Sequence, residues 1–290
     1  TLLCDQHLES GGRGIKEMLE ATSLEKAQVP LEPPVLELQL DIKKASRVAG
    51  LADYGALLAT ALPYELVRLS SDGSPVGPRF RAEDYINAII PEGDTVLVLE
   101  RHGRISRFCL DDLSRPTHTW RVDVGWLWGG AALSHHQLVC TDTDRGEVFT
   151  CDIGDKSTVE KQVKVTGLRE PTCVACAGEG DSAVFAVTEF RRHKVHIYNS
   201  TWEPQFTIGG AGSEDGKLDY PYCCLFVSTY NLLVADMDNG RVTEFTRTGQ
   251  FVRHVVTAKD GIRDTSFISF VHPHLWLVHE EKVARLKIYE

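Results

Sequence analysis

The sequence predicts an all-β fold, a six-bladed β-propeller that is preceded by a short α-helix and closed by a strand from its N-terminal side. Three observations predict it. An apolar strand recurs at spacings of 39, 42, 46, 48 and 44 residues. A strand with polar–apolar alternation follows each copy, and further strands flank most of the pairs. Four strands in about 40 to 45 residues are typical of one propeller blade.

The first 34 residues are expected to form a helix and a Pro-rich linker. The segment 14–27 is rich in helix formers and carries an apolar stripe at helical spacing. Prolines between residues 30 and 34 make the linker stiff. The helix either docks on the propeller, frays in solution or ends a longer coiled coil.

The propeller is expected to span residues 35–290. The recurring apolar strands begin at Ala56, Thr95, Gln137, Ala183, Asn231 and Leu275, and the alternating strands after them at Glu65, Ile105, Glu147, Lys194, Arg241 and Val283. The sixth unit ends one strand short. The alternating segment 35–40 can supply this missing outer strand, and we predict that the pairing closes the ring.

The composition excludes several other classes of protein. The 290 residues are 42% hydrophobic and 25% charged, as in an ordinary globular chain. The formal net charge of -10 argues against a dedicated nucleic-acid binder. No stretch approaches the ~20 apolar residues that a membrane span requires. Because the chain begins at Thr1 and carries no signal sequence, we expect a piece of a longer cytoplasmic protein.

Metal and cofactor sites are not predicted. Most of the eight cysteines lie in apolar strand-like runs and are expected to be reduced core residues. The C-x-x-C pair of Cys173 and Cys176 has no second ligand pair at a usable spacing for zinc. Residues 236–240 resemble a calcium loop, but the Gly falls one place early and Arg247 stands at the twelfth position. We therefore predict no metal, no cofactor and no catalytic residue.

The fifth unit resembles an NHL repeat. The residues that carry the resemblance are Gly209–Gly212, Gly216, Leu218, Pro221, Leu233–Asp236, Asn239–Val242, Phe245 and Thr248–Phe251. The fourth unit is similar but weaker. The competing WD40 propeller has no support, because the chain contains no Trp-Asp dipeptide. The resemblance implies that Asp236 braces the neighbouring turn through hydrogen bonds to backbone amides.

A helix, a Pro-rich linker and an NHL-like propeller together resemble the C-terminal half of a tripartite-motif ubiquitin ligase. The resemblance implies an upstream RING, B-boxes and a coiled coil that makes the parent protein dimeric, while we expect this chain itself to be monomeric. No cluster of Cys and His in the sequence has RING or B-box spacing. The resemblance further implies that the propeller selects a protein substrate or RNA. A role in innate immunity would follow from the family alone, since many such ligases act there.

A binding site is predicted on one face of the propeller. In a four-stranded blade, the turn between the second and third strands lies on the same face as the connections between blades. The candidates are Arg101, His102, Arg145, Arg191, Arg192, His193, Lys194 and Arg241 from the turns, and Trp126, Trp128, Tyr220 and Tyr222 from the connections. Arginine forks and aromatic rings suit an acidic peptide or an RNA backbone. The face can thus be locally positive although the molecule is acidic.

Simpler explanations stand beside these candidates. The basic run 191–194 can be a solvated turn, and Trp126 and Trp128 lie on the same side of an extended chain, where packing between blades explains them. We favour a non-catalytic module that recognises protein within a ubiquitin ligase. The alternatives are an RNA-binding propeller and a calcium-dependent hydrolase or lyase. The last needs inward polar ligands, and the expected innermost strands are apolar apart from Asn87 and Ser269.

Overall fold

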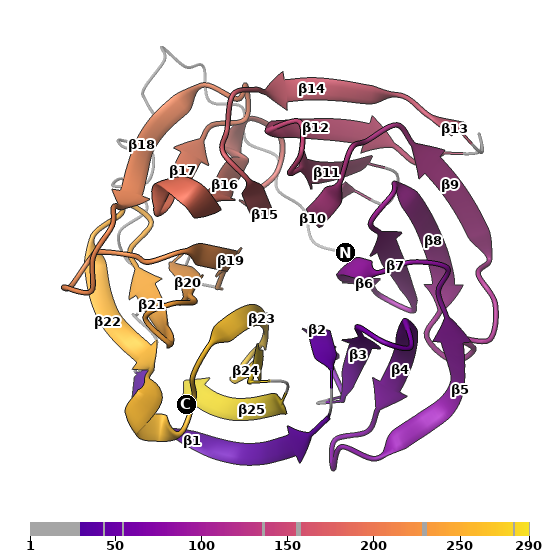
Figure 1. The fold of residues 1–290 in the computed structure, drawn as a ribbon, viewed down its shortest axis with the longest axis horizontal. Helices are drawn as coiled ribbons and strands as arrows, with labels where there is room; N and C mark the ends of the chain where they lie inside the picture. The colour runs from indigo at the N-terminus through magenta and orange to yellow at the C-terminus, as the bar shows by residue number, and fades with distance from the viewer. Residues whose placement is uncertain are drawn as a thin grey trace, which may run out of the picture.

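Six small antiparallel sheets stand in a ring around a central axis (Figure 1), so the six-bladed propeller is confirmed. The computed structural model describes residues 30–42, 44–53, 55–134, 137–154, 158–227, 231–280 and 282–289. The predicted helix within 14–27 lies outside these residues. Besides 25 strands, the described chain has three 3₁₀ turns, at Gly180–Ser182, Phe190–Arg192 and Ala258–Asp260.

The blades follow one another along the chain, and we number them from 1 to 6. Blade 1 contains β2 (Ala45–Gly50), β3 (Ala56–Thr60), β4 (Glu65–Leu69) and β5 (Pro75–Arg81). Blade 2 contains β6 (Ile86–Glu92), β7 (Thr95–Glu100), β8 (Arg104–Cys109) and β9 (His118–Val122). Blade 3 contains β10 (Leu127–Ser134), β11 (Gln137–Asp142), β12 (Glu147–Asp152) and β14 (Lys161–Val165).

The second half of the ring repeats this order from the axis outward. Blade 4 contains β15 (Pro171–Ala177), β16 (Val184–Glu189), β17 (Lys194–Tyr198) and β18 (Pro204–Gly209). Blade 5 contains β19 (Pro221–Phe226), β20 (Leu232–Asp236), β21 (Arg241–Phe245) and β22 (Phe251–Val256). Blade 6 contains β23 (Thr265–Val271), β24 (His274–His279), β25 (Lys282–Tyr289) and β1 (Pro30–Asp41).

The ring is closed by the strand from the N-terminal side, as predicted. β1 pairs antiparallel with β25, with Leu36 opposite Leu286 and Leu40 opposite Val283. β1 begins at Pro30, so the residues expected as a linker are part of the strand, with an irregular register before Val35. Prolines are tolerated there because β1 is the outermost strand of its blade, where a missing N–H breaks no central ladder.

The core lies between the faces of neighbouring blades. Leu57 and Leu66 of blade 1, for example, belong to one buried cluster with Val98 and Phe108 of blade 2. The second strands are buried along nearly their whole length because a blade covers each of their faces, which explains their continuous apolar runs.

One strand departs from the predicted pattern. β13 (Thr158–Val159) leaves blade 3 and pairs in parallel with β9 at the outer edge of blade 2. Trp120 in β9 donates its indole N–H to the carbonyl of Gly154 in the same excursion, at 2.8 Å. Two residues are too few to show a strand period, so the sequence could not reveal this pairing.

Candidate binding surface on the loop face

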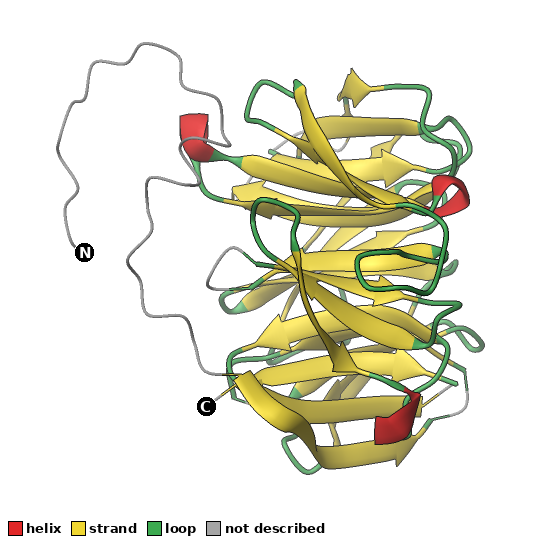
Figure 2. Ribbon diagram, turned by 90° about the vertical axis from the view of Figure 1, so that its left-hand side faces the viewer, coloured by secondary structure: helices red, strands yellow, loops and turns green. Residues whose placement is uncertain are grey.

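The turns between second and third strands meet the interblade connections on one face, which we call the loop face. The amide of Leu127 donates to the carbonyl of Arg101 at 2.9 Å, and that of Phe190 donates to Glu170 at 3.2 Å. Figure 2 shows the ring from the side, with the loops gathered at its two faces. The predicted grouping of these two loop sets is therefore present.

A buried carboxylate ends the second strand in four consecutive blades. These residues are Glu100, Asp142, Glu189 and Asp236. Each accepts at least one hydrogen bond, of 2.6 to 3.1 Å, from a backbone N–H in the connection that leads into its blade. Burial raises the pKa of Glu100 and of Asp236, and the donated hydrogen bonds oppose that rise. The bracing role implied for Asp236 is thus repeated around the ring.

Asp142 shows how such a brace fixes the loop face. Its two oxygens accept hydrogen bonds from the amides of Gly125 and Trp126, at 2.9 and 3.1 Å. The amide of Arg145 adds a third bond at 3.3 Å, and Lys161 Nζ lies 3.8 Å away. The carboxylate therefore holds the backbone that carries Trp126.

Six of the predicted cationic residues lie beside carboxylates, and we call them the rim residues. The pairs are His102 with Asp84 (3.4 Å), Arg145 with Asp123 (3.1 Å), Arg191 with Glu170 (3.0 Å), Arg192 with Glu189 (3.4 Å), His193 with Asp219 (2.9 Å) and Arg241 with Asp236 (2.7 Å). The Arg145 guanidinium lowers the pKa of Asp123 through a hydrogen bond and its charge. The local positive charge expected for this face is therefore cancelled at the rim.

Arg241 is the most enclosed of the rim residues. Besides Asp236, its guanidinium contacts the carbonyls of Ser213, Glu214 and Lys217, and it lies 3.2 Å from His254 Nε2. These contacts occupy all the N–H donors of the guanidinium. Arg241 therefore braces an interblade connection and has no N–H left for a ligand.

The basic run after Phe190 divides between two environments. Phe190–Arg192 forms one 3₁₀ turn, which directs Arg191 and Arg192 to solvent and to their carboxylates. The Phe190 ring contacts Tyr220 and Tyr222, at centroid distances of 4.7 and 5.9 Å. Lys194 begins β17 half-buried and has no ion pair within the described chain. The two arginines of the run are thus exposed and ion-paired, whereas Phe190 packs against aromatic rings nearer the axis.

Aromatic and arginine side chains from all six blades meet at the axis of the loop face. We call this set the central cluster: Arg47, Tyr85, Arg101, Trp126, Trp128, Phe190, Tyr220, Tyr222 and Phe267. The two tryptophan rings are 5.3 Å apart, on one side of the chain as predicted, and Trp128 lies 6.0 Å from Tyr222 across the axis. All members except Arg47 are half-buried. Trp128 therefore contacts Tyr222 of blade 5 and Arg47 of blade 1, neither of which is adjacent to its own blade.

Arg47 lies at the middle of the central cluster and is 2% exposed. Its guanidinium carbon lies over the rings of Phe267, Tyr85, Trp128 and Tyr222, at 4.6, 5.6, 5.7 and 5.9 Å. It donates to the carbonyls of Asn87 (2.8 Å) and Ser46 (2.7 Å) and to the Asn87 side chain (3.3 Å). Within the part of the chain that the structure describes, it has no carboxylate partner.

Arg101 is the second cation of the cluster without an ion pair among the described residues. Its guanidinium carbon lies 4.6 Å from the Trp126 centroid and 5.2 Å from that of Tyr85. Arg101 Nε and Trp126 Nε1 are both buried and have no acceptor within the described ranges. Trp128 Nε1 is in the same state, so three nitrogen donors at the centre of the loop face are left unsatisfied by the described residues.

The predicted site residues did not include four members of the cluster, namely Arg47, Tyr85, Phe190 and Phe267. Arg47 did carry a signal, because it is a charge inside an otherwise small and apolar innermost strand. Tyr85 directly precedes β6 and Phe267 is the third residue of β23, whereas Trp128 and Tyr222 are the second residues of their innermost strands. No single position of the repeat therefore identifies Tyr85 and Phe267 from the sequence.

Metal ligands do not gather in the described residues, which contain no group of three or more His, Cys, Asp or Glu side chains able to hold an ion. His196 and His274 instead contact carboxylates, Glu189 at 2.6 Å and Glu37 at 2.9 Å. Cys109, Cys140, Cys151, Cys173, Cys223 and Cys224 are free thiols. Burial raises the pKa of Cys176 to about 11, so this thiol is protonated at neutral pH.

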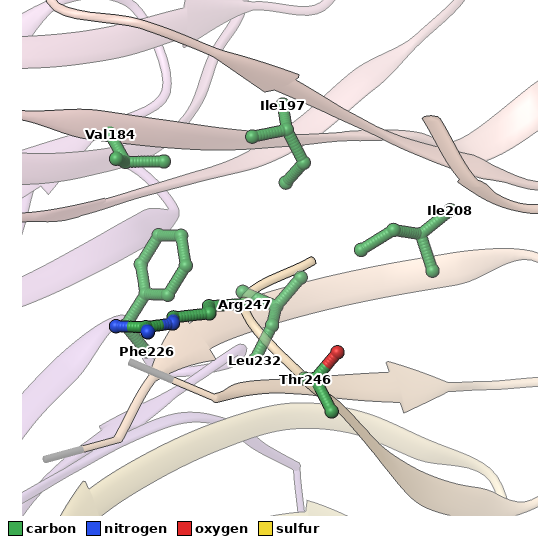
Figure 3. Close-up of a pocket in the computed structure, with 7 residues that line it drawn as sticks. All are labelled: Val184, Ile197, Ile208, Phe226, Leu232, Thr246 and Arg247. Carbon is green, nitrogen blue, oxygen red and sulfur yellow. The ribbon is translucent and has the colours of Figure 1, made fainter. Parts of the chain in front are cut away.

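A small apolar pocket lies between blades 4 and 5, away from the loop face (Figure 3). Its lining is Val184, Ile197, Ile208, Phe226, Leu232, Thr246 and Arg247. The enclosed space would hold about one water molecule. It is too small for an organic substrate, so the loop face is the better candidate site.

Comparisons with known proteins show the fold and leave the family open. No family model and no curated protein matches the sequence. The Cps50 (Swd1) β-propeller domain from Myceliophteria thermophila is 10% identical with a TM-score of 0.61, over 88% of this chain and 99% of that one. A luciferin-regenerating enzyme is 12% identical with a TM-score of 0.65, over 90% and 97%. Regucalcin from Agrobacterium tumefaciens, a calcium-binding protein, is 11% identical with a TM-score of 0.64, over 89% and 94%.

These structures share an architecture that serves different functions, so the resemblance carries no function to this chain. Within the described residues, no helix has the length and hydropathy to cross a bilayer.

Proposed function

We propose that this propeller is a non-catalytic recognition module that binds a protein partner at the central cluster of its loop face. The observation that carries the proposal is the composition of that cluster. Trp, Tyr and Arg are the residues that dominate binding energy at protein interfaces, and they do so at the centre of the contact. The paired rim residues surround this centre as a polar border does in such interfaces.

We further propose that the partner is a substrate of a RING-type ubiquitin ligase of the tripartite-motif class. This part rests on the NHL-like residues of blade 5, from Gly209 to Phe251. The carboxylate brace supports the same proposal. The resemblance implies this brace for Asp236, and equivalent acids make it in blades 2, 3 and 4.

The alternatives are less well supported by the same geometry. A calcium-dependent hydrolase needs anionic ligands at the axis, whereas Arg47 places a positive charge there. RNA binding draws its affinity from cations that are free to meet phosphates, and six of the predicted cations already have carboxylate neighbours. Protein recognition needs neither anionic metal ligands at the axis nor a row of unpaired cations.

The recognition function is tested by capture and mapping. The 290-residue chain is immobilised, captured proteins are identified, and each is retested against Trp126→Ser. We expect that substitution to weaken capture by about tenfold or more, since it removes a central aromatic anchor. The control is Val163→Ser, which changes an exposed residue on the outer strand β14. If Val163→Ser weakens capture and Trp126→Ser leaves it unchanged, the proposal is contradicted.

The ligase context needs its own experiment. The native polypeptide that contains this chain is immunoprecipitated and supplied with ubiquitin, activating enzyme, conjugating enzyme and ATP. We expect ubiquitin chains to form on the precipitate and on the captured partner. A native polypeptide that transfers no ubiquitin with any conjugating enzyme would remove the ligase assignment and leave the recognition module intact.

A further inference from the structure

The charges of the loop face are distributed unequally. Each rim residue has a carboxylate within 4 Å, but Arg47 and Arg101 have none among the described residues. A buried guanidinium without a counter-ion is uncommon in proteins, because the interior stabilises a charge poorly. Arg47 therefore leaves uncompensated positive charge directly beneath the rings of the central cluster.

The unsatisfied polar atoms at this place are all donors. Arg101 Nε, Trp126 Nε1 and Trp128 Nε1 are buried without an acceptor in the described ranges. A complementary ligand must therefore bring acceptors, and two acceptor atoms together suit a guanidinium best. Charge and hydrogen bonding thus both specify a ligand that is anionic and rich in acceptors.

Arg101 is held ready for such a ligand. Its guanidinium carbon lies over the rings of Trp126 and Tyr85, at 4.6 and 5.2 Å, and these contacts limit the side-chain entropy lost on binding. Trp126 is itself fixed through its amide by the buried Asp142. The positions of the donors are therefore set before a ligand arrives.

On these grounds we propose that the central cluster binds an acidic linear peptide of the partner, with an Asp or Glu carboxylate received by Arg101 over the buried charge of Arg47. The inference rests on the proposed recognition function and adds the chemistry of the partner. The half-buried rings around Arg101 accommodate the apolar part of the peptide.

A carboxylate peptide fits this face better than a nucleic-acid backbone. Asp219, Asp238 and Asp264 lie together at the blade 5 side, where burial and its two neighbours raise the pKa of Asp238. A strand of phosphates that crosses the face would meet these carboxylates as well as the net charge of -10. A single peptide carboxylate placed at the axis avoids these three aspartates.

The test begins with a displayed library of random dodecapeptides, selected on the 290-residue chain. We expect enrichment of Asp and Glu relative to the unselected library. One enriched peptide is then synthesised together with a version in which its acid is replaced by the amide, and affinities are measured through tryptophan fluorescence. We expect the amide peptide and Arg101→Gln each to weaken binding by about tenfold or more.

The pairing is isolated by combining the two changes. If Arg101 receives the carboxylate, the amide peptide loses little further affinity for Arg101→Gln, so the two effects are not additive. The matched control is Arg68→Gln in β4, which should change affinity by less than about twofold because that arginine pairs with Asp53 in the β2–β3 turn, at the opposite end of blade 1 from the loop face. The amide peptide alters no protein residue, so a folding defect cannot imitate its effect.

The outcomes separate this inference from the function on which it rests. Selected peptides without acid enrichment that still require Trp126 overturn the acidic-peptide inference and leave protein recognition standing. A library that yields no binder also overturns it. Binding of a random 20-nucleotide RNA pool that is lost in Arg101→Gln, with no protein captured at Trp126, overturns both in favour of phosphate recognition.

Discussion

The rim and the centre of the loop face contain the same kinds of residue in opposite states. At the rim, Arg191 and Arg192 are exposed and lie 3.0 and 3.4 Å from carboxylates. At the centre, Arg101 and the buried Arg47 contact aromatic rings and have no carboxylate partner in the described chain. Whether an arginine is available to bind a ligand therefore depends on whether a carboxylate lies beside it, and a count of charges along the sequence does not report this.

The ends of the second strands account for the missing counter-ion at Arg47 but not at Arg101, which directly follows the buried Glu100 of blade 2. Blades 2 to 5 end these strands in a buried acid, whereas blade 1 has Thr60 and blade 6 has His279 at that place. The acids brace the connections and neutralise cations around most of the ring. Arg47 belongs to blade 1, which supplies no such acid.

The largest expected effect comes from breaking a brace, with Asp142→Ala. The change leaves the amides of Gly125, Trp126 and Arg145 without their acceptor and removes one of the two carboxylates near Lys161, which keeps Glu147. We expect the free energy of unfolding to fall by about 3 to 5 kcal/mol in denaturant titrations. The exposed Asp144→Ala should change it by less than about 0.5 kcal/mol. Equal effects of the two variants would show that the brace is not structural.

The next effect tests the buried charge at the centre. Arg47→Met keeps an unbranched apolar stem but removes three hydrogen bonds, so we expect a loss of about 1 to 2 kcal/mol in the free energy of unfolding. Affinity for an acidic peptide should fall with it, and Arg47→Lys should retain more affinity than Met because it keeps the charge. If Met and Lys bind the peptide equally, Arg47 contributes packing alone.

A smaller effect concerns pH and His279. This histidine is 0% exposed, and burial lowers its pKa. The unfolded chain takes up a proton near pH 6.5 while the folded chain resists it, so stability is lost as the pH falls below about 6.5. We expect His279→Leu to flatten this decline between pH 7 and pH 5 in thermal unfolding.

Other groups limit how far that decline flattens. Burial also lowers the pKa of His254 and of His274, so they contribute in the same sense as His279. Glu100 and Asp236 have raised pKa values and act in the opposite sense, because they bind protons more readily when folded. An unchanged pH profile for His279→Leu would mean that His279 takes up its proton without unfolding.

The smallest effect is expected at the rim. Arg191→Gln removes an exposed pair with Glu170, and such pairs contribute about 0 to 1 kcal/mol. We expect the midpoint of unfolding to stay nearly constant in urea. A loss comparable to that of Arg47→Met would erase the distinction between rim and centre.

The fold could be predicted from the sequence because an apolar strand recurs at regular spacing from Ala56 to Leu275. The closure of the ring could be predicted because the sixth unit lacks an outer strand, which β1 supplies. Backbone conformation was less visible. Glu170, Tyr220 and Asp264 precede innermost strands with φ of 53°, 51° and 49°, a shared left-handed geometry that these three different residue types do not reveal.

The site was predicted only in outline. The sequence placed Trp126, Trp128, Tyr220 and Tyr222 on the loop face, where the structure has them, but it did not distinguish paired from unpaired cations there. Which arginine is paired depends on contacts between residues far apart in the chain, such as Arg191 with Glu170. Such pairing becomes visible only when the blades are assembled.

The account is tested most directly by locating the partner on the surface. A photoreactive amino acid is placed at position 102, beside Arg101, or at position 163 on the outer strand β14, and each chain is irradiated with its captured partner. We predict cross-links from position 102 and none from position 163. Cross-links from position 163 alone would contradict the claim that the centre of the loop face is the binding site.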